Sequence, residues 1–269
     1  MTTPDELSVT QQQHDQMLRL VTRSFYRELV NYGITAGEVV TVAGHLLDNV
    51  VQNGTHTAGA TEYYNRLFTT GDIRDAWHDA ARLSVGKVSI SPVTDGQIPA
   101  IVGWMRTPAI RDNFYPPFPE ARDALAAYFR TPSRRYFTIF HGGEPVGLIG
   151  AENLDQAAEK LEMRKLVGDP RMHGEGIGKH ATFLFLYYAF VILKFRKVYI
   201  YSLDINVRNI NLNGGFGFEL EGVFYEDVLI RDAWRDVVRM ALTAPVWLEL
   251  FDRPSGAQRD ALLAAGSVV

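Results

Sequence analysis

The chain has 269 residues, enough for one large domain or for an ordinary domain and a smaller one. Hydrophobic residues make up 46% of it, which excludes an intrinsically disordered protein. The formal net charge of −4, without a long basic run, argues against a nucleic-acid or lipid-headgroup surface, and the absence of cysteine excludes disulfides, thiolate nucleophiles and zinc–thiolate sites.

The N-terminus shows no targeting or membrane segment. Residues 1–13 are polar and lack the apolar core of a secretory signal, so we expect a cytoplasmic protein. The most apolar stretch, 182–193, is too short to cross a bilayer, and we expect it to be a buried helix.

The first 85 residues are expected to be helical. One helix is predicted by apolar residues at helical spacing, namely Leu18, Val21, Phe25 and Leu29. Thr35 and Glu38 have the spacing of a capping box, which predicts the start of a second helix. A third helix is expected over 72–83, and we find no strand pattern before residue 86.

Alternating strands begin after Gly86, and we therefore place a domain boundary there. The sequence predicts a small all-α domain over 1–85, a mixed α/β domain over 86–253 and a loosely ordered tail over 254–269. In the larger domain, strands are expected at 87–91, 135–140, 145–151, 160–167, 197–203, 219–229 and 235–242. Helices are expected at 98–104, 120–130, 178–194 and 208–214.

A glycine-rich segment lies between the strand at 160–167 and the following helix. Its alternating glycines allow close approach of a ligand to the backbone, and they are Gly174, Gly176 and Gly178. The next helix begins there with unpaired N–H groups and a partial positive charge, which favours phosphate binding. The alternative is a tight strand-to-helix turn. The dinucleotide fingerprint has another glycine spacing, and the nucleotide P-loop needs Ser or Thr where this chain has His180.

Two segments resemble the GNAT superfamily of N-acyltransferases. Residues 173–178, His-Gly-Glu-Gly-Ile-Gly, are similar to its acyl-CoA loop, Gln/Arg-x-x-Gly-x-Gly/Ala, with His173 as a departure that Arg171 could compensate. Residues 206–222 are similar to its second block, which contains Asn-x-x-Ser-x-x-Leu-Asn/Tyr. The version with Asn213, followed by Glu226 and Asp236, is most similar to the ribosomal-protein-alanine and spermidine acetyltransferase branch. The resemblance does not extend to the first 85 residues, in which we recognise no family.

The resemblance implies a GNAT fold, with a mixed twisted sheet, splayed central strands and flanking helices. It also implies transfer of an acetyl or other acyl group from acyl-CoA to a primary amine, by direct attack in a ternary complex. The acceptor is a small molecule or a protein N-terminus. Acyl-carrier protein or aminoacyl-tRNA are alternative donors, docked by the N-terminal domain, although the acidic balance argues against tRNA. The sequence does not decide whether the chain forms a homodimer.

The resemblance also implies the cofactor-binding residues. The backbone of Leu166 and Val167 is expected to bind the pantetheine arm. The loop is expected to bind the pyrophosphate through its backbone and charged side chains, namely Arg171, His173, Gly174, Glu175, Gly176, Ile177, Gly178 and Lys179. Asn206 and Asn209 are expected near the pantetheine. Lys179 as a solvated helix residue and His173 as an exposed loop residue are the alternatives.

The catalytic residues are less uniform in the family. Asn213 occupies the position where many relatives have a Tyr acid, and it can hold the sulfur but cannot give up a proton. Glu162 and Glu226 are the candidate bases, each with an ordinary surface or substrate-binding role as the alternative; Tyr225 and Tyr199 rank below them. His180 and His45 are expected to be structural. No His and carboxylate pair has metal-ligand spacing, so no metal is expected.

Overall fold

The structure is a computed structural model that describes residues 4–31, 33–35, 37–40, 42–43, 59–111, 114, 116–169, 172–203, 206–230 and 232–255. It divides into two compact units, residues 1–64 with 201–241 and residues 65–200 with 242–269. Among the described helices, none combines the length and the apolar character that a membrane span requires.

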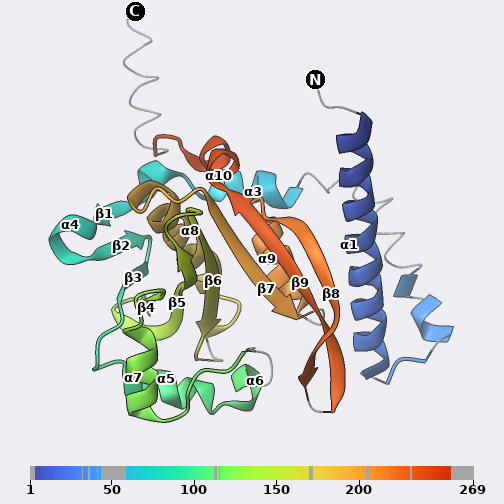
Figure 1. The fold of residues 1–269 in the computed structure, drawn as a ribbon, viewed down its shortest axis with the longest axis horizontal. Coiled ribbons are helices and arrows are strands. Elements are labelled where there is room, and N and C mark those ends of the chain that lie inside the picture. Colours follow the sequence, from blue (N-terminus) through green and yellow to red (C-terminus); the bar gives the residue numbers. More distant parts are fainter. Residues whose placement is uncertain are drawn as a thin grey trace, which may run out of the picture. The chain divides into compact units, whose positions relative to one another are not determined.

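The larger unit, 65–200 with 242–269, is built on a mixed sheet (Figure 1). Its strands follow one another in chain order, each antiparallel to the next, as β1 (Arg74–Ala76), β2 (Arg82–Val85), β3 (Val88–Pro92), β4 (Arg135–His141), β5 (Glu144–Asp155) and β6 (Lys160–Val167). β7 (Lys197–Leu203) starts in this unit and pairs parallel to β6 only from Lys160 to Glu162. β6 runs on to Val167, so the predicted mixed sheet with splayed strands is confirmed.

Helices cover both faces of this sheet. On one side lie α5 (Ile98–Met105), α6 (Pro108–Arg111) and α7 (Arg122–Phe129), and on the other lies α8 (Ile177–Tyr187), which continues as the π-helical η3 (Tyr188–Ile192). Successive β6 residues point to opposite faces. Arg164 therefore stacks on Phe118 in the segment before α7, whereas Lys165 reaches Thr182 on α8.

A last helix, α10 (Ala244–Phe251), was not predicted from the sequence. Its apolar face is short, but Trp247 and Phe251 are fully buried. Both rings pack against Phe183 of α8, with centroids 5.6 Å away. The partner of this helix lies some sixty positions upstream, so only the tertiary structure identifies α10 as part of the core.

The smaller unit, 1–64 with 201–241, combines two segments that lie far apart in the sequence. It holds α1 (Pro4–Asn31), α9 (Val207–Gly214), the hairpin β8 (Glu219–Ile230) and β9 (Ala233–Thr243), and the start of α3 (Gly59–Leu67). α1 contacts β8 and α9, and Figure 1 shows α1 running beside β8. Tyr64 packs edge-on against Phe216, with ring centroids 4.8 Å apart.

The prediction of a third helix over 72–83 is wrong. This segment forms η1 (Thr70–Asp72), β1, the single turn α4 (Trp77–Ala80) and β2. Strands this short give too little alternation to be recognised in a sequence. β2 and β3 pair on either side of Gly86, where φ is 56°, so the boundary expected at Gly86 falls inside a hairpin.

Other predictions in the N-terminal part have mixed outcomes. The capping box is confirmed, because the Thr35 N–H donates to Glu38 Oε2 at 2.8 Å and the Glu38 N–H donates to Thr35 Oγ1 at 3.4 Å. The helix predicted around Leu18 is confirmed as α1. His45 and most of the second helix lie outside the described residues.

Candidate active site

The glycine-rich loop connects β6 to α8 in a conformation that requires glycine. Gly174 and Gly176 have φ angles of 96° and 75°, in the left-handed region that other residues rarely adopt. Gly176 is the N-cap of α8 and provides no side-chain cap. The first-turn N–H groups of Ile177 and Gly178 therefore have no acceptor within the helix and can bind an anion. This geometry fits a pyrophosphate.

Other loop residues have partners inside the protein. The Lys179 N–H donates to the Gly176 carbonyl at 3.0 Å, so it is less available to a phosphate than its neighbours are. His173 Nε2 bonds the Val167 carbonyl at 3.1 Å, which holds its ring over the end of β6. His180 bonds the Gly176 carbonyl and packs edge-on against Phe68, as expected of a structural residue. Glu175 is exposed, and Arg171 lies outside the described residues.

Two consecutive hydrogen bonds connect β6 to the start of α8, beneath the glycine-rich loop. Lys165 Nζ donates to Thr182 Oγ1 at 2.9 Å, and Thr182 Oγ1 donates to the Gly178 carbonyl at 2.7 Å. Burial lowers the pKa of Lys165 to about 7. These hydrogen bonds hold the first turn of α8 in place, where the N–H groups of Ile177 and Gly178 lie. Sequence reasoning missed Lys165, although its position in β6 places it on the α8 face.

Glu162 lies where β6 and β7 separate. It is the last β6 residue paired with β7, opposite Tyr199, and only 7% of it is exposed. Asn153 Nδ2 donates to its Oε2 at 2.9 Å. Directly across on β5 is a second carboxylate, Glu152. The structure therefore places one predicted base at the fork of the sheet, in the same unit as the glycine-rich loop.

Glu152 is held as a charged group by a network that the sequence did not reveal. Tyr128 and Tyr136 donate their hydroxyls to Glu152 Oε1, and Arg164 Nη1 donates to the same oxygen at 2.9 Å. Burial alone would raise the pKa of Glu152, but the two tyrosine hydrogen bonds and Arg164 together lower it. Burial and the bond to Glu152 raise the pKa of Tyr128 to about 12. The tyrosines are therefore neutral donors at neutral pH.

Arg164 also ties the segment before α7 to the sheet. Its Nη2 donates to the Pro116 carbonyl, and its guanidinium lies 4.3 Å from the ring centroid of Phe114 and 4.9 Å from that of Phe118. Its side chain is 5% exposed. Because Glu162 and Arg164 lie on the same face of β6, this segment is fixed beside the fork.

The predicted asparagines form one hydrogen-bond chain in the smaller unit. Asn206 is the N-cap of α9, and its Oδ1 accepts from the Asn209 N–H at 3.2 Å. Asn213 is completely buried, and its Nδ2 donates to the Asn209 carbonyl at 2.8 Å and to Asn209 Oδ1 at 3.1 Å. Asn209 Nδ2 donates to Ser202 Oγ. Asn213 would have to release Asn209 before it could donate to a thioester sulfur.

The other candidate base has different surroundings. Glu226 is exposed and belongs to the smaller unit, at a bulge where its φ is 49°. Its N–H donates to Asp236 Oδ1 at 2.9 Å, and its carboxylate has no hydrogen bond to the part of the chain that the structure describes. Tyr225 is also exposed, whereas Tyr199 is buried. Of the two candidate carboxylates, Glu162 is therefore the buried one, and it lies where β6 and β7 separate.

Replacing the fully buried Asn213 with alanine is expected to lower the free energy of unfolding by about 1–3 kcal/mol, because the change removes the donor to two acceptors of the half-buried Asn209. Urea unfolding measures this effect. Asn211→Ala, on the exposed side of α9, is the control and should change stability by less than ~0.5 kcal/mol. If Asn213→Ala kept full stability but lost turnover, its role would be chemical.

Comparisons with known proteins agree with this geometry. A family model described as Acetyltransferase (GNAT) domain matches residues 87–219. The spermidine N(1)-acetyltransferase of Escherichia coli K12 is 25% identical over 128 residues, which are 48% of this chain and 68% of that protein. The Vibrio cholerae spermidine N-acetyltransferase in complex with CoA and spermine superposes with a TM-score of 0.57 at 20% identity, over 60% of this chain and 98% of that one. Residues 87–219 of this chain therefore match a GNAT acetyltransferase domain, and the solved structure shares its fold.

Proposed function

We propose that the chain acetylates a primary amine of a small molecule in a ternary complex, with Glu162 as the base. One observation carries the proposal: the stretch of β6 beyond its last pairing with β7 has Glu162 at one end and the anion-binding loop at the other. At ~3.3 Å per residue, the stretch from Glu162 to Val167 spans about 16 Å. An extended linker between a diphosphate and a thioester can run along such an edge, bound by the backbone of Leu166 and Val167.

The residues of this stretch have separate tasks in the proposed reaction. The N–H groups of Ile177 and Gly178 bind the diphosphate. An amine must be neutral to attack, so Glu162 accepts a proton from the ammonium, directly or through one water. The amine nitrogen then forms a bond to the thioester carbonyl carbon, the carbon–sulfur bond breaks, and the nitrogen gives its second proton to water. A thiolate with a pKa near ~8.5 leaves without an acid, which suits a chain with Asn213 in place of tyrosine.

The acceptor class is proposed from the similarity to proteins named for spermidine and from the enclosed carboxylates near the fork. The test is an assay of CoA release with acetyl-CoA and spermidine, beside a peptide with a free N-terminus. Mass spectrometry of the products identifies the acetylated nitrogen. We expect acetylspermidine or another acetylated small amine. Acetylation of the peptide alone would overturn the proposal in favour of a protein substrate.

Gly176→Asp should weaken CoA binding by well over ~10-fold, equivalent to more than ~1.4 kcal/mol. The substitution places a carboxylate against the diphosphate, at a position where φ is 75°. Calorimetric titration with CoA measures the loss. Gly176→Asn separates charge from conformation and should lose less affinity.

Gly142→Asp is the matched control, because Gly142 is also left-handed, with φ 59°, but lies in the β4–β5 turn. It should leave CoA affinity unchanged. Equal CoA affinity in Gly176→Asp and the unmodified protein would show that the diphosphate binds elsewhere.

A further inference from the structure

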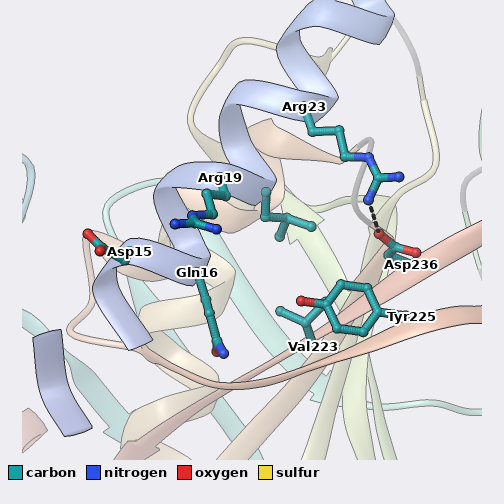
Figure 2. A pocket seen from close by; sticks show the side chains of 8 residues that line it. Asp15, Gln16, Arg19, Arg23, Val223, Tyr225 and Asp236 are labelled. Atoms are coloured by element: carbon teal, nitrogen blue, oxygen red, sulfur yellow. Dashed lines mark ion pairs between the residues drawn. The ribbon is translucent and has the colours of Figure 1, made fainter. Parts of the chain in front are cut away.

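A pocket of about 420 Å³ lies within the smaller unit, between one face of α1 and the β8–β9 hairpin (Figure 2). α1 contributes Asp15, Arg19 and Arg23, and the hairpin contributes Tyr225 and Asp236. The volume is in the range of small-molecule sites. None of these α1 residues belongs to the family match at 87–219, so the α1 side of the pocket lies outside the matched domain.

Asp236 gives the pocket an acceptor that lacks a hydrogen bond. The residue is 4% exposed, and its Oδ1 accepts from the Glu226 N–H at 2.9 Å, in the bulge of β8. Its Oδ2 is buried and receives no hydrogen bond from the described residues. Arg23 Nη1 lies 3.8 Å from this oxygen, which is an ion pair but beyond hydrogen-bond distance. A buried carboxylate oxygen in this state favours a ligand with an N–H donor.

The remaining lining determines what kind of ligand fits. Asp15 and Asp236 carry two negative charges, and Arg19 and Arg23 carry two positive ones, so the lining is neutral overall. A simple cation would meet both arginines, and a simple anion would meet both aspartates. A ligand with one charge of each sign avoids both conflicts. Leu20, which is 6% exposed, and Val223 add apolar surface.

We propose that this pocket binds a free amino acid with an apolar side chain, as a zwitterion. Its ammonium donates to Asp236 Oδ2, its carboxylate accepts from the Arg19 guanidinium, and its side chain lies on Leu20 and Val223. Arg19 lines the pocket, and Figure 2 shows its side chain lying along α1 on the side of Asp15 and the Tyr225 hydroxyl pointing toward α1. The bulge at Glu226 fixes the Asp236 carboxylate in advance, which lowers the cost of ordering it on binding.

The test is calorimetric titration of the full chain with L-leucine, with 3-methylbutylamine, which lacks the carboxylate, and with 4-methylpentanoate, which lacks the ammonium. We expect leucine to bind at least ~10-fold more tightly than either analogue, because each analogue loses one charge-assisted contact. Equal binding of the amine and leucine, or no binding of leucine at millimolar concentration, would overturn the proposal.

Substitutions of Asp236 and Arg19 test the two charged contacts proposed for the ligand. Asp236→Asn and the exposed Arg19→Gln are each expected to weaken leucine binding at least ~10-fold. Arg27→Gln removes the same charge from α1 outside the pocket lining and should bind leucine as before. Leucine affinity that is unchanged in Arg19→Gln would contradict the proposal. CoA titration of the same variants keeps this site distinct from acetyl transfer, because CoA affinity should not change.

Discussion

Glu162→Gln is expected to lower kcat about 10²- to 10⁴-fold, the range attributed to a general base, while CoA affinity stays the same. Glutamine has the size of glutamate and keeps an acceptor for Asn153 Nδ2, so the change removes the basicity of Glu162 and leaves its packing intact. Steady-state kinetics and CoA titration measure the two effects separately.

Glu226→Gln makes the same chemical change at the other predicted base. Because the Glu226 side chain is exposed and, among the described residues, only its backbone N–H makes a hydrogen bond, we expect a loss in kcat of less than ~3-fold, within ~0.7 kcal/mol. If Glu226→Gln lost more activity than Glu162→Gln, the base would be Glu226 and the assignment to the sheet fork would be wrong.

The sequence predicted the central part of the larger unit well. The strands over 160–167 and 197–203 match β6 and β7 at both ends, and the helix after the loop is α8. These elements have long periodic patterns and strong punctuation by glycine, so local information is sufficient. The same punctuation located the glycine-rich loop before α8.

The parts that the sequence missed depend on contacts between distant segments. Glu152 is held by Tyr128, Tyr136 and Arg164, which come from three different elements, and no local pattern connects them. α1 belongs to the unit that contains β8, although most of the chain separates them. The predicted division into 1–85 and 86–253 followed composition along the chain, whereas the observed units follow packing.

Arg164→Met is expected to lower the free energy of unfolding by about 3–5 kcal/mol, the cost of removing one partner from a buried ion pair. Methionine replaces the packing against Phe118 but cannot bond Glu152 or the Pro116 carbonyl. Urea unfolding at pH 7 measures the loss. Arg164→Met with Glu152→Gln should recover much of it, because the buried charge is then removed as well.

Arg130→Met is the matched control, because Arg130 pairs with Asp95 at 2.7 Å, closer than Arg164 pairs with Glu152. The side chains of Arg130 and Asp95 are 67% and 72% exposed, and an exposed pair is worth only about 0–1 kcal/mol. An equal loss in Arg130→Met and Arg164→Met would contradict the role given to burial.

Acid provides a second test of the same network. The folded-state pKa of Glu152 is lowered, so its charge stabilises the fold above the pKa of an unfolded glutamate, ~4.3, and this contribution is lost as the pH falls through the folded-state value. Burial raises the pKa of Glu152 and Arg164 lowers it, so the pKa of Glu152 should be higher in the variant than in the unmodified protein. The difference in unfolding free energy between the unmodified protein and Arg164→Met should therefore narrow as the pH falls from the raised pKa of Glu152 in the folded variant to its lowered pKa in the folded unmodified protein. A difference that stayed constant down to acid pH would show that Arg164 stabilises the fold through its packing on Phe114 and Phe118, and that its charge contributes little.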